Sequence, residues 1–324
     1  MRVLITGGHG LVGHAVQATA PAGITTAYSG MPRPNQPNRG GFDADLTDAN
    51  ACQALFDRFR PTHVLHLAAR VGGVGANSRA NADFFRDNIL INTHVLDAVR
   101  RSHTEHGPPV ERTIALLSSC VYPDAAAKPL READLHAGEP HPSNFGYAYA
   151  KRMLEVHARA LREQVGCHIA CLIPNNLYGP HDHFDLEAGH VIPALIRKIH
   201  AASIDGAPPV LWGDGTPLRE FTFSHDLGRA LWWALSHYDG PPLNAGTSVE
   251  TSIRQAAETI CRAFHVDPAR LVWDTARPSG QHRKPTDTTR YRALANLPDT
   301  PFETGIAETV RWYLANFPNV RGVA

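Results

Sequence analysis

The chain has 324 residues, with 31 acidic side chains (Asp and Glu) balanced by 31 basic ones (Lys and Arg). This balance argues against the broad basic surface that nucleic-acid binding requires. Hydrophobic residues make up 43% of the chain, as in globular proteins, and no apolar run approaches the length of a membrane-spanning helix. We therefore expect a globular protein with room for one large α/β unit and a smaller lobe.

The cysteines are scattered and form no C-x-x-C pair, which favours a reducing compartment. The chain enters a strand-like run at once with "MRVLITGG", which leaves no room for a signal peptide. We expect a cytoplasmic protein with no membrane partner. His181, Asp182 and His183 stand together in "GPHDHF", but nothing at zinc-site spacing completes four ligands, so no bound metal is expected.

Short apolar runs alternate with helical patterns in the first half of the chain. The expected strands are residues 2–6, 24–28, 63–69, 113–119 and 169–174. The expected helices begin near Leu11, Asn50, Asn81 and Tyr147. This alternation predicts the α/β class, a doubly wound parallel sheet of Rossmann type that binds ligands at the carboxyl ends of its strands.

From about Tyr178 the loops lengthen, which predicts a smaller C-terminal α/β lobe. We expect a helix over 190–202 and a strand followed by a helix over 219–235. A further amphipathic helix over 250–264 is expected to be capped by Thr251 or Ser252.

A glycine-rich turn follows the first expected strand in "LITGGHGLVGHAV". Its G-x-x-G-x-x-G spacing permits a tight turn and brings a pyrophosphate close to the start of the next helix. The position between strand and helix makes this turn a stronger sign of dinucleotide binding than glycine alone. The expected cofactor contacts are Gly7, His9, Gly10, Leu11, Val12, Gly13 and, near the end of the third expected strand, Ala68.

The second expected strand ends in "TTAYSG" without the carboxylate that NAD-binding chains place there, which favours NADP. Arg33 and Arg39 in the next loop, together with His9, are candidates for the 2′-phosphate, although a solvated loop charge explains either arginine taken alone better. In "DADLTD", Asp45 is expected at the exocyclic amine of adenine and Leu46 over its ring.

Tyr147 and Lys151 lie four residues apart in "NFGYAYAKRM" and so share one helical face. A phenol donates a proton during hydride transfer only if its pKa falls, and a lysine ammonium one turn away is expected to lower it. Ser118, near the end of the fourth expected strand, is expected to bind the same substrate oxygen. Y-x-x-x-K alone is common on helix surfaces, and the glycine turn is what makes the combination specific.

Together with "HLAARVGGVGAN", "SSCVYP", "NNLYGPHDHF", "GHVIPALIRK" and "VLWGDGTPLREF", these stretches resemble the extended short-chain dehydrogenase/reductase family nearly end to end. The resemblance points to its GDP-sugar epimerase/reductases. It implies NADPH-dependent 3,5-epimerisation and 4-reduction of GDP-4-keto-6-deoxy-D-mannose. It also implies a homodimer that pairs the helices near 82–101 and 147–164.

By the same resemblance, Cys120 and His190 are the acid and base of the epimerisation. Inverting a carbon requires two groups on opposite faces of the sugar that gain and lose a proton near pH 7, and a thiol and an imidazole meet this need. From the residues alone, Cys120 would be an inert buried thiol and His190 a hydrogen-bonding residue at a helix start.

The resemblance further implies the residues around the two ligands. The expected substrate contacts are Asn176, Lys198, Trp212, Arg219 and Lys284, and Asn176, Tyr147 and Lys151 are also expected at the cofactor. The chain departs from the family pattern at Asn175, His183 and Arg70. The expected domains are 1–177 with 219–245 for NADP, and 178–218 with 246–324 for the GDP-sugar.

Other functions remain open from the sequence. The same chemistry, or reduction alone, on another GDP-4-keto sugar such as a 6-deoxy-heptose would need the same residues. A dehydratase is expected to carry an acidic pair where Ser119 and Cys120 stand, and a 4-epimerase needs no Cys/His pair. A catalytically silent NADP-sensing regulator would not need Tyr147, Lys151 or Ser118.

Overall fold

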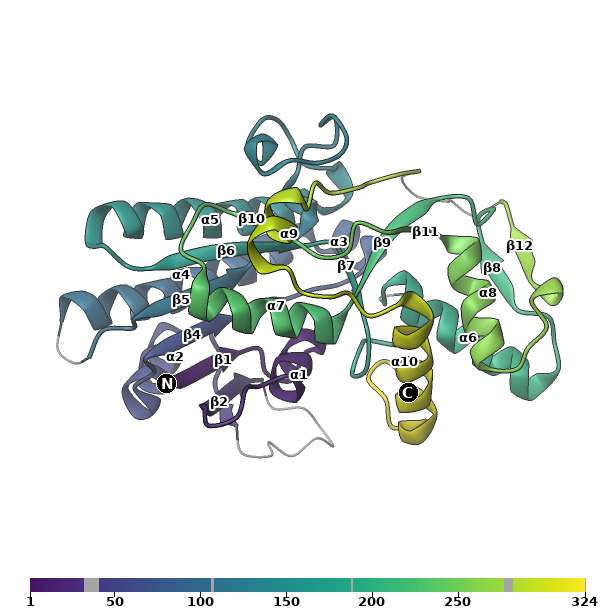
Figure 1. Cartoon of the computed structure of the whole chain (residues 1–324), viewed down its shortest axis with the longest axis horizontal. Coiled ribbons are helices and arrows are strands. Elements are labelled where there is room, and N and C mark those ends of the chain that lie inside the picture. The colour runs from purple at the N-terminus through teal and green to yellow at the C-terminus, as the bar shows by residue number, and fades with distance from the viewer. Residues whose placement is uncertain (32–40, 106–107, 188, 277–281, 324) are drawn as a thin grey trace.

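The computed structural model describes residues 1–31, 41–105, 108–187, 189–276 and 282–323. Figure 1 shows a large sheet with helices on both faces and a smaller lobe that contains the C-terminal end of the chain. Arg33 and Arg39, two candidates for a phosphate contact, lie outside the described residues.

The large sheet has seven strands in the order β10-β6-β5-β4-β1-β2-β3. Every neighbouring pair is parallel, which confirms the expected doubly wound α/β fold. The strand order reverses between β1 and β4, and this reversal is where such sheets open a crevice for ligands. The strands are β1 (Arg2–Thr6), β2 (Thr25–Gly30), β3 (Phe42–Asp43), β4 (His63–His66), β5 (Arg112–Leu116), β6 (Ile169–Pro174) and β10 (Leu243–Ala245).

Helices cover both faces of this sheet because its strands are apolar on both sides. On one face lie α2 (Ala49–Phe59), α4 (Asn81–Thr104) and α5 (Phe145–Val165). On the other face lie α1 (Leu11–Ala18), α7 (Ser224–His237) and α9 (Thr289–Ala295). The short α3 (Val74–Arg79) precedes α4. In the described part of the chain, no helix combines the length and the apolar character needed to cross a membrane.

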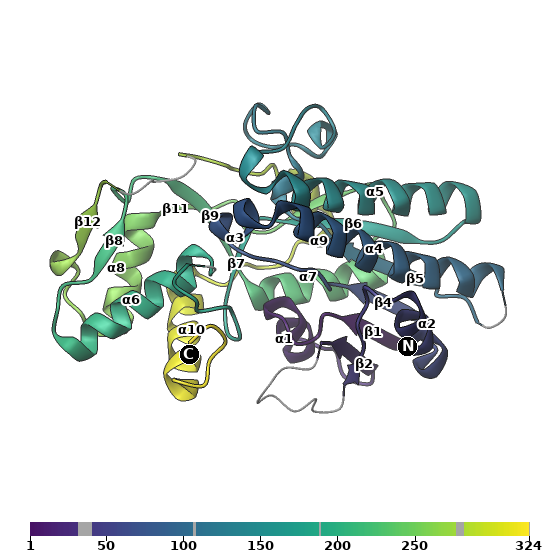
Figure 2. The same cartoon turned by 180° about the vertical axis from the view of Figure 1, so that it is seen from behind.

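The smaller lobe has its own apolar core, which includes Phe184, Ile260 and Tyr313. Its strands form a three-stranded sheet, ordered β11-β9-β7, and the pair β12-β8. Figure 2 shows its helices from the opposite side. The strands are β7 (Asn176–Tyr178), β8 (Val210–Trp212), β9 (Leu218–Phe223), β11 (Glu250–Ser252) and β12 (Val272–Asp274), and the helices are α6 (Val191–Asp205), α8 (Ile253–Ala263) and α10 (Phe302–Asn316).

The long elements begin close to where the sequence predicts them, and α5 starts only two residues before Tyr147. The strands expected over 63–69 and 113–119 end sooner, at His66 and Leu116, so that Ala68 and Ser118 lie in the segments leaving the sheet. The sequence pattern missed the strands of the smaller lobe other than β9, because each has only three residues, too few to show an alternation.

The helix α8 begins with a reciprocal cap. The hydroxyl of Ser252 accepts the backbone N–H of Gln255 at 3.0 Å, and the side chain of Gln255 accepts the backbone N–H of Ser252 at 2.9 Å. The structure therefore selects Ser252, and not Thr251, as the capping residue.

We predict that Ser252→Ala lowers the free energy of unfolding by about 1 kcal/mol, because the first turn of α8 loses its side-chain acceptor. Urea-induced unfolding followed by circular dichroism measures the change. Thr251→Ala is the matched control and should shift the unfolding midpoint far less. An equal loss in the two variants would contradict the cap.

Candidate active site

The glycine turn forms a narrow cradle between β1 and α1. Gly7 has φ +74°, and a Cβ there would lie 2.8 Å from the Cα of Ala68. A Cβ on Gly13 would lie 2.5 Å from the carbonyl oxygen of Gly7. Gly10 precedes α1 and has no side chain to cap it, so amide N–H groups of the first turn are left for an anionic ligand. These features fit the pyrophosphate of a dinucleotide.

His9, in the glycine turn between β1 and α1, lies against the end of β2, where an acid would stand in an NAD-binding chain. Its ring meets Tyr28 edge-on with the centroids 5.4 Å apart, and it packs against Gly30. Beyond the next strand, Leu46 is buried, while Asp45 accepts the N–H and the hydroxyl of Thr47 at 2.9 and 2.7 Å. A carboxylate at this point would repel the negative charge of a phosphate, whereas a histidine would not.

Tyr147 and Lys151 lie one turn apart on α5, with the Lys151 Nζ 6.0 Å from the Tyr147 ring centroid. The Ser118 side chain lies beside the Tyr147 hydroxyl and acts on its pKa as a hydrogen-bonding group, so the structure brings together the serine and tyrosine that the sequence singled out. Lys151 is only 2% exposed, and its ammonium donates to the carbonyl of Leu116, the last residue of β5, at 2.7 Å.

Burial governs the pKa values of this pair. Burial of the ammonium lowers the pKa of Lys151 from 10.5 to about 8, although nearby Cys171 opposes the shift. The protein around the Tyr147 phenol raises its pKa by desolvation, Cys120 adds to the rise, and the hydrogen bond from Ser118 opposes it. The expected lowering by Lys151 is therefore not what this structure shows, because desolvation of the phenol outweighs the favourable contacts.

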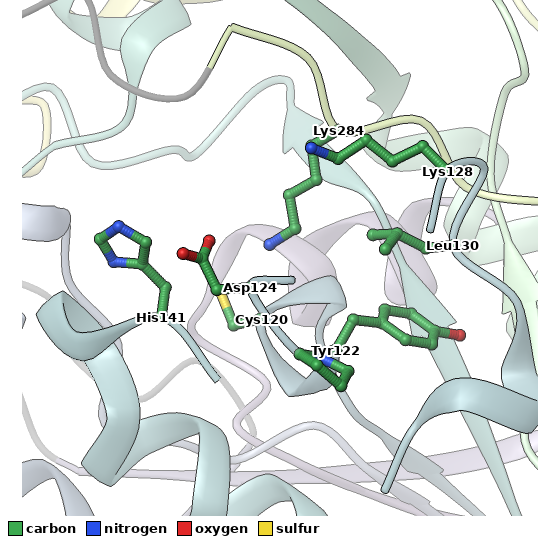
Figure 3. Close-up of a pocket in the computed structure, with 8 residues that line it drawn as sticks. Cys120, Tyr122, Asp124, Lys128, Leu130, His141 and Lys284 are labelled. Carbon is green, nitrogen blue, oxygen red and sulfur yellow. The ribbon is translucent and has the colours of Figure 1, made fainter. Parts of the chain in front are cut away.

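Cys120 lies in a short 3-10 turn (Ser119–Val121) just beyond β5. Its backbone N–H donates to the Ser118 hydroxyl at 3.3 Å. This one hydrogen bond helps to orient the Ser118 side chain and to hold the backbone that carries the thiol. The thiol is partly exposed and opens into a pocket (Figure 3). The pocket is lined by Cys120, Tyr122, Pro123, Asp124, Lys128, Leu130, His141 and Lys284.

Arg152 holds two walls of this pocket together. It is 3% exposed and donates to the carbonyl of Val121 and to that of Gly138, each at 2.7 Å. The same two segments also pair directly, through the Asp124 N–H on the Glu139 carbonyl at 3.0 Å. A guanidinium suits this task, because its fixed geometry presents several donors at once.

Lys284 reaches the pocket from a segment near the end of the chain. Leu130 donates its N–H to the Pro285 carbonyl at 2.9 Å, and this fixes the segment beside the pocket. The buried carboxylate of Glu220 accepts the hydroxyl and the N–H of Thr286 at 2.6 and 3.0 Å. Burial raises the pKa of Glu220, and the hydrogen bonds from Thr286 and Asn175 oppose the rise.

His190 is exposed to solvent and lies directly before α6. It is not among the residues that line the Cys120 pocket. The nearby Asp182 is buried, and burial raises its pKa, while the charges of His190 and Arg321 oppose the rise. The backbone of Arg321 accepts the N–H of Phe184 at 2.8 Å, so the C-terminal segment supports the loop before His190.

The histidines considered as metal ligands have other contacts. His181 stacks on His14 with the ring centroids 3.7 Å apart, and His183 donates its N–H to the carboxylate of Asp182 at 2.7 Å. Among the described residues, no three His, Cys, Asp or Glu side chains gather as a metal site would require.

The expected substrate residues lie largely in the smaller lobe. The Lys198 Nζ lies 4.5 Å from the centroid of the Trp212 ring, which is 49% exposed. Arg219 donates to the Leu218 carbonyl at 2.7 Å, and burial lowers its pKa. Asn176 donates to the backbone of Glu220 at 3.1 Å. The half-exposed indole offers a flat surface for a ring, and the two cations suit phosphate oxygens.

Two departures from the family pattern are tied into the fold. The Asn175 side chain donates to Glu220 at 3.1 Å and to the carbonyl of Thr247 at 2.8 Å. Arg70 forms an ion pair with Asp87 at 2.6 Å. Asn175 thus helps to hold the Glu220 carboxylate, which also binds Thr286.

Sequence reasoning missed His141, Asp124 and Lys128, which line the pocket beside Cys120. Asp124 and Lys128 carry no motif signal. His141 carries a local one, because its side chain accepts the N–H of Ser143 at 3.2 Å in "HPSN" and so starts a short turn before α5.

We predict that the buried Lys151 ammonium lowers stability below pH 8 and that this effect disappears at higher pH. Below pH 8 the lysine is charged in both states, so the full cost of its burial is present; between about pH 8 and 10.5 the folded state loses its proton first. The unfolding free energy of the wild type should therefore rise relative to Lys151→Met between pH 7 and 10. Urea unfolding at each pH measures this difference.

Lys128→Met is the matched control, because Lys128 is exposed. Its stability difference from the wild type should stay nearly constant over the same pH range. A constant difference for Lys151→Met as well would show that the ammonium of Lys151 carries no burial cost.

Known proteins resemble this chain over nearly its full length. The NAD dependent epimerase/dehydratase family matches residues 3–246. A probable GDP-L-fucose synthase of Drosophila melanogaster is 38% identical, with 99% of each chain covered. The GDP-L-fucose synthase of Dictyostelium discoideum is 37% identical, covering 98% of this chain and 97% of its own.

Solved structures agree with these relatives. A GDP-L-fucose synthetase from Naegleria fowleri, solved with NADP bound, is 38% identical, with a TM-score of 0.86 over 99% of this chain and 96% of that one. The glycine cradle, the Ser118–Tyr147 contact and the buried Lys151 described above fit this likeness. The chain therefore belongs to the NAD dependent epimerase/dehydratase family, in the branch that contains these GDP-L-fucose synthases.

Proposed function

We propose that this chain converts GDP-4-keto-6-deoxy-D-mannose to GDP-L-fucose by NADPH-dependent 3,5-epimerisation and 4-reduction. The observation that carries the proposal is the placement of Ser118 and Lys151 beside Tyr147, with Cys120 two residues after Ser118. This arrangement gathers the acid needed for reduction and a thiol suited to epimerisation at the end of one strand. The relatives in this branch of the family support the choice of sugar.

Bound NADPH supplies the hydride for C4 of the sugar. In our proposal, Gly7, Gly10 and Gly13 hold its pyrophosphate, since a side chain at Gly7 or Gly13 would fill the cradle. His9 faces the 2′-phosphate, because it stands where an acid would otherwise select NAD. Leu46 and Asp45 line the adenine, and Leu11, Val12, Ala68 and Asn176 complete the cofactor contacts.

Epimerisation comes first in the proposed order. The 4-ketone makes the protons on C3 and C5 acidic, and Cys120 and His190 remove and return these protons from opposite faces of the ring. Ser118 and Tyr147 stabilise the charge that develops on O4 by hydrogen bonding. Their positions support this division, since Cys120 lines the pocket beside α5 and His190 lies at the start of α6 in the other lobe.

Reduction then requires a proton at O4 as the hydride arrives at C4. Tyr147 donates this proton, and Ser118 orients the oxygen. The ammonium of Lys151 stabilises the phenolate that remains, because a neighbouring positive charge favours the charged form. A high pKa in the absence of substrate keeps the Tyr147 phenol protonated and therefore ready to donate.

The proposed substrate site joins the two parts of the chain. Trp212 packs on a ring of the nucleotide, Lys198 and Arg219 bind phosphate, and Asn176 and Lys284 contact the GDP-sugar near the pocket. We assign residues 1–177 with 219–245 to NADP and 178–218 with 246–324 to the GDP-sugar. Two boundaries need refinement, because Phe221 and Phe223 of β9 pack in the core of the smaller lobe, whereas Tyr291 of α9 packs in the core of the large sheet.

We also propose a homodimer that pairs the helices near 82–101 and 147–164. Phe85 and Met153 are apolar side chains of these helices that are 42% and 39% exposed, and a symmetric interface would cover them. We place the protein in the cytoplasm, with the free cysteines at Cys52, Cys120, Cys167, Cys171 and Cys261 in support.

We predict that Tyr147→Phe lowers the turnover of GDP-4-keto-6-deoxy-D-mannose by about 10²–10⁴, because the proton donor for O4 is lost. Oxidation of NADPH at 340 nm measures turnover, and fluorescence titration should give an NADPH affinity close to that of the wild type. Tyr149→Phe is the matched control on the same helix and should retain most activity. Near-normal turnover of Tyr147→Phe would assign the proton to another residue.

We predict that Cys120→Ala suppresses the exchange of protons at C3 and C5 when the keto sugar is incubated in heavy water without NADPH. The wild type should introduce deuterium at both carbons, which NMR of the sugar detects. His190→Asn should impair exchange as well, at the same carbon or at the other one. Reduction at C4 by the Cys120 variant should continue slowly and yield a product with unepimerised carbons.

Cys52→Ala and Cys261→Ala are the matched controls, because both thiols are fully buried in apolar cores. Both should exchange as the wild type does. If the wild type reduces the 4-keto sugar without exchanging these protons, the epimerase half of the proposal is wrong.

A further inference from the structure

The pocket beside Cys120 contains an imidazole, that of His141, for which no role is assigned above. Cys120 and His141 are 21 positions apart in the sequence, yet they line the same pocket. In Figure 3, the carboxylate of Asp124 lies between the imidazole of His141 and the amine of Lys284, and Cys120 is drawn below it. His141 is thus the histidine that shares a pocket with the thiol, whereas His190 stands at the start of α6.

The contacts of its own turn select the tautomer of the neutral His141 ring. Its Nδ1 accepts the backbone N–H of Ser143 at 3.2 Å and lies 2.7 Å from the hydroxyl of Ser143. A backbone N–H only donates, so Nδ1 must carry the lone pair. The neutral ring then carries its proton on Nε2, which is a hydrogen-bond donor.

The turn that carries His141 is held in place from two other elements. The hydroxyl of Ser78 in α3 donates to the Ser143 carbonyl at 3.2 Å, and the N–H of Gly146 donates to Asn81 at the start of α4 at 3.0 Å. A Cβ on Gly146 would meet the Asn81 backbone, so the two chains approach closely here. The donor is therefore presented by a rigid support, which lowers the entropy cost of binding.

The wall that carries Cys120 is joined to the wall that carries His141. Pro123 and Pro140 form an isolated β-bridge, and Arg152 donates to the carbonyls of Val121 and Gly138. These contacts fix the separation between thiol and imidazole before any ligand arrives. A group that fills the pocket beside Cys120 is therefore bounded by the His141 wall as well.

We propose that His141 is a substrate-contacting residue whose Nε2–H donates a hydrogen bond to an oxygen of the sugar ring held against Cys120. The inference rests on the proposed function, in which this pocket takes the 4-keto sugar. A fixed donor favours sugars that place a hydroxyl or keto oxygen at that point, because a donor that a bound ligand covers and leaves unpaired costs free energy. His141 thereby helps to select the sugar, and the cations of the site bind the diphosphate.

The test compares His141→Phe, which removes the donor, with His141→Gln, whose amide reaches the position of Nε2. His141→Phe should raise the KM for GDP-4-keto-6-deoxy-D-mannose by about tenfold, as loss of one hydrogen bond implies. His141→Gln should recover most of this loss. Calorimetric titration with GDP, which lacks the 4-keto hexose, should give the wild-type affinity in both variants. His237→Phe, a histidine at the end of α7, is the matched control and should behave as the wild type.

A second variant covers the case in which His141→Phe does not fold. Ser143→Ala keeps the backbone N–H on Nδ1 but removes the hydroxyl, and it should raise KM in the same direction by a smaller factor. An unchanged KM in His141→Phe, or in Ser143→Ala where the former is unfolded, would overturn the inference. An equal loss of GDP affinity would also overturn it, because the contact would then be to the nucleotide. If the wild type itself fails to turn over the sugar, the proposed function fails instead.

Discussion

The site depends on one buried hydrogen bond, from the ammonium of Lys151 to the carbonyl of Leu116 at 2.7 Å. This bond ties α5 to the end of β5, and Ser118 and Cys120 follow directly after that strand end. The bond therefore fixes where Tyr147 of α5 lies relative to Ser118 and Cys120. A cation is needed because a neutral side chain could not favour a phenolate on the same helical face.

This arrangement places the positive charge of Lys151 where it is poorly solvated, which costs free energy. Burial lowers the pKa of Lys151 to about 8, and the neighbouring His66 is buried as well, with its pKa lowered to about 3. His66 bonds Thr6 at 2.8 Å and Asn92 at 3.0 Å, so it remains neutral and satisfied beneath the lysine. A neutral imidazole in this position avoids a second buried positive charge, which would lower the pKa of Lys151 further.

A second polar network joins the two parts of the molecule. Asn244 of β10 accepts the hydroxyl of Tyr122 at 2.6 Å and donates to the carbonyls of Leu130 and Asp287. Glu220 of β9 anchors Thr286, two residues beyond Lys284. These bonds hold the pocket wall behind Cys120 and the segment that carries Lys284 to each other. We therefore expect a movement of the smaller lobe to shift the pocket wall beside the thiol.

The sequence by itself determined the alternation of strands and helices, the glycine turn at the first crossover and the shared face of Tyr147 and Lys151. These features follow from the two-residue period of strands, the 3.6-residue period of helices and short-range sterics. All three can be recognised in a sequence before its fold is known. Only the tertiary structure decided that His141 lies beside Cys120, because that neighbourhood depends on the pairing of residues 123–124 with 139–140 and on the bonds from Arg152. It also decided that desolvation governs the pKa of Tyr147, since burial is a property of the packed chain and not of spacing.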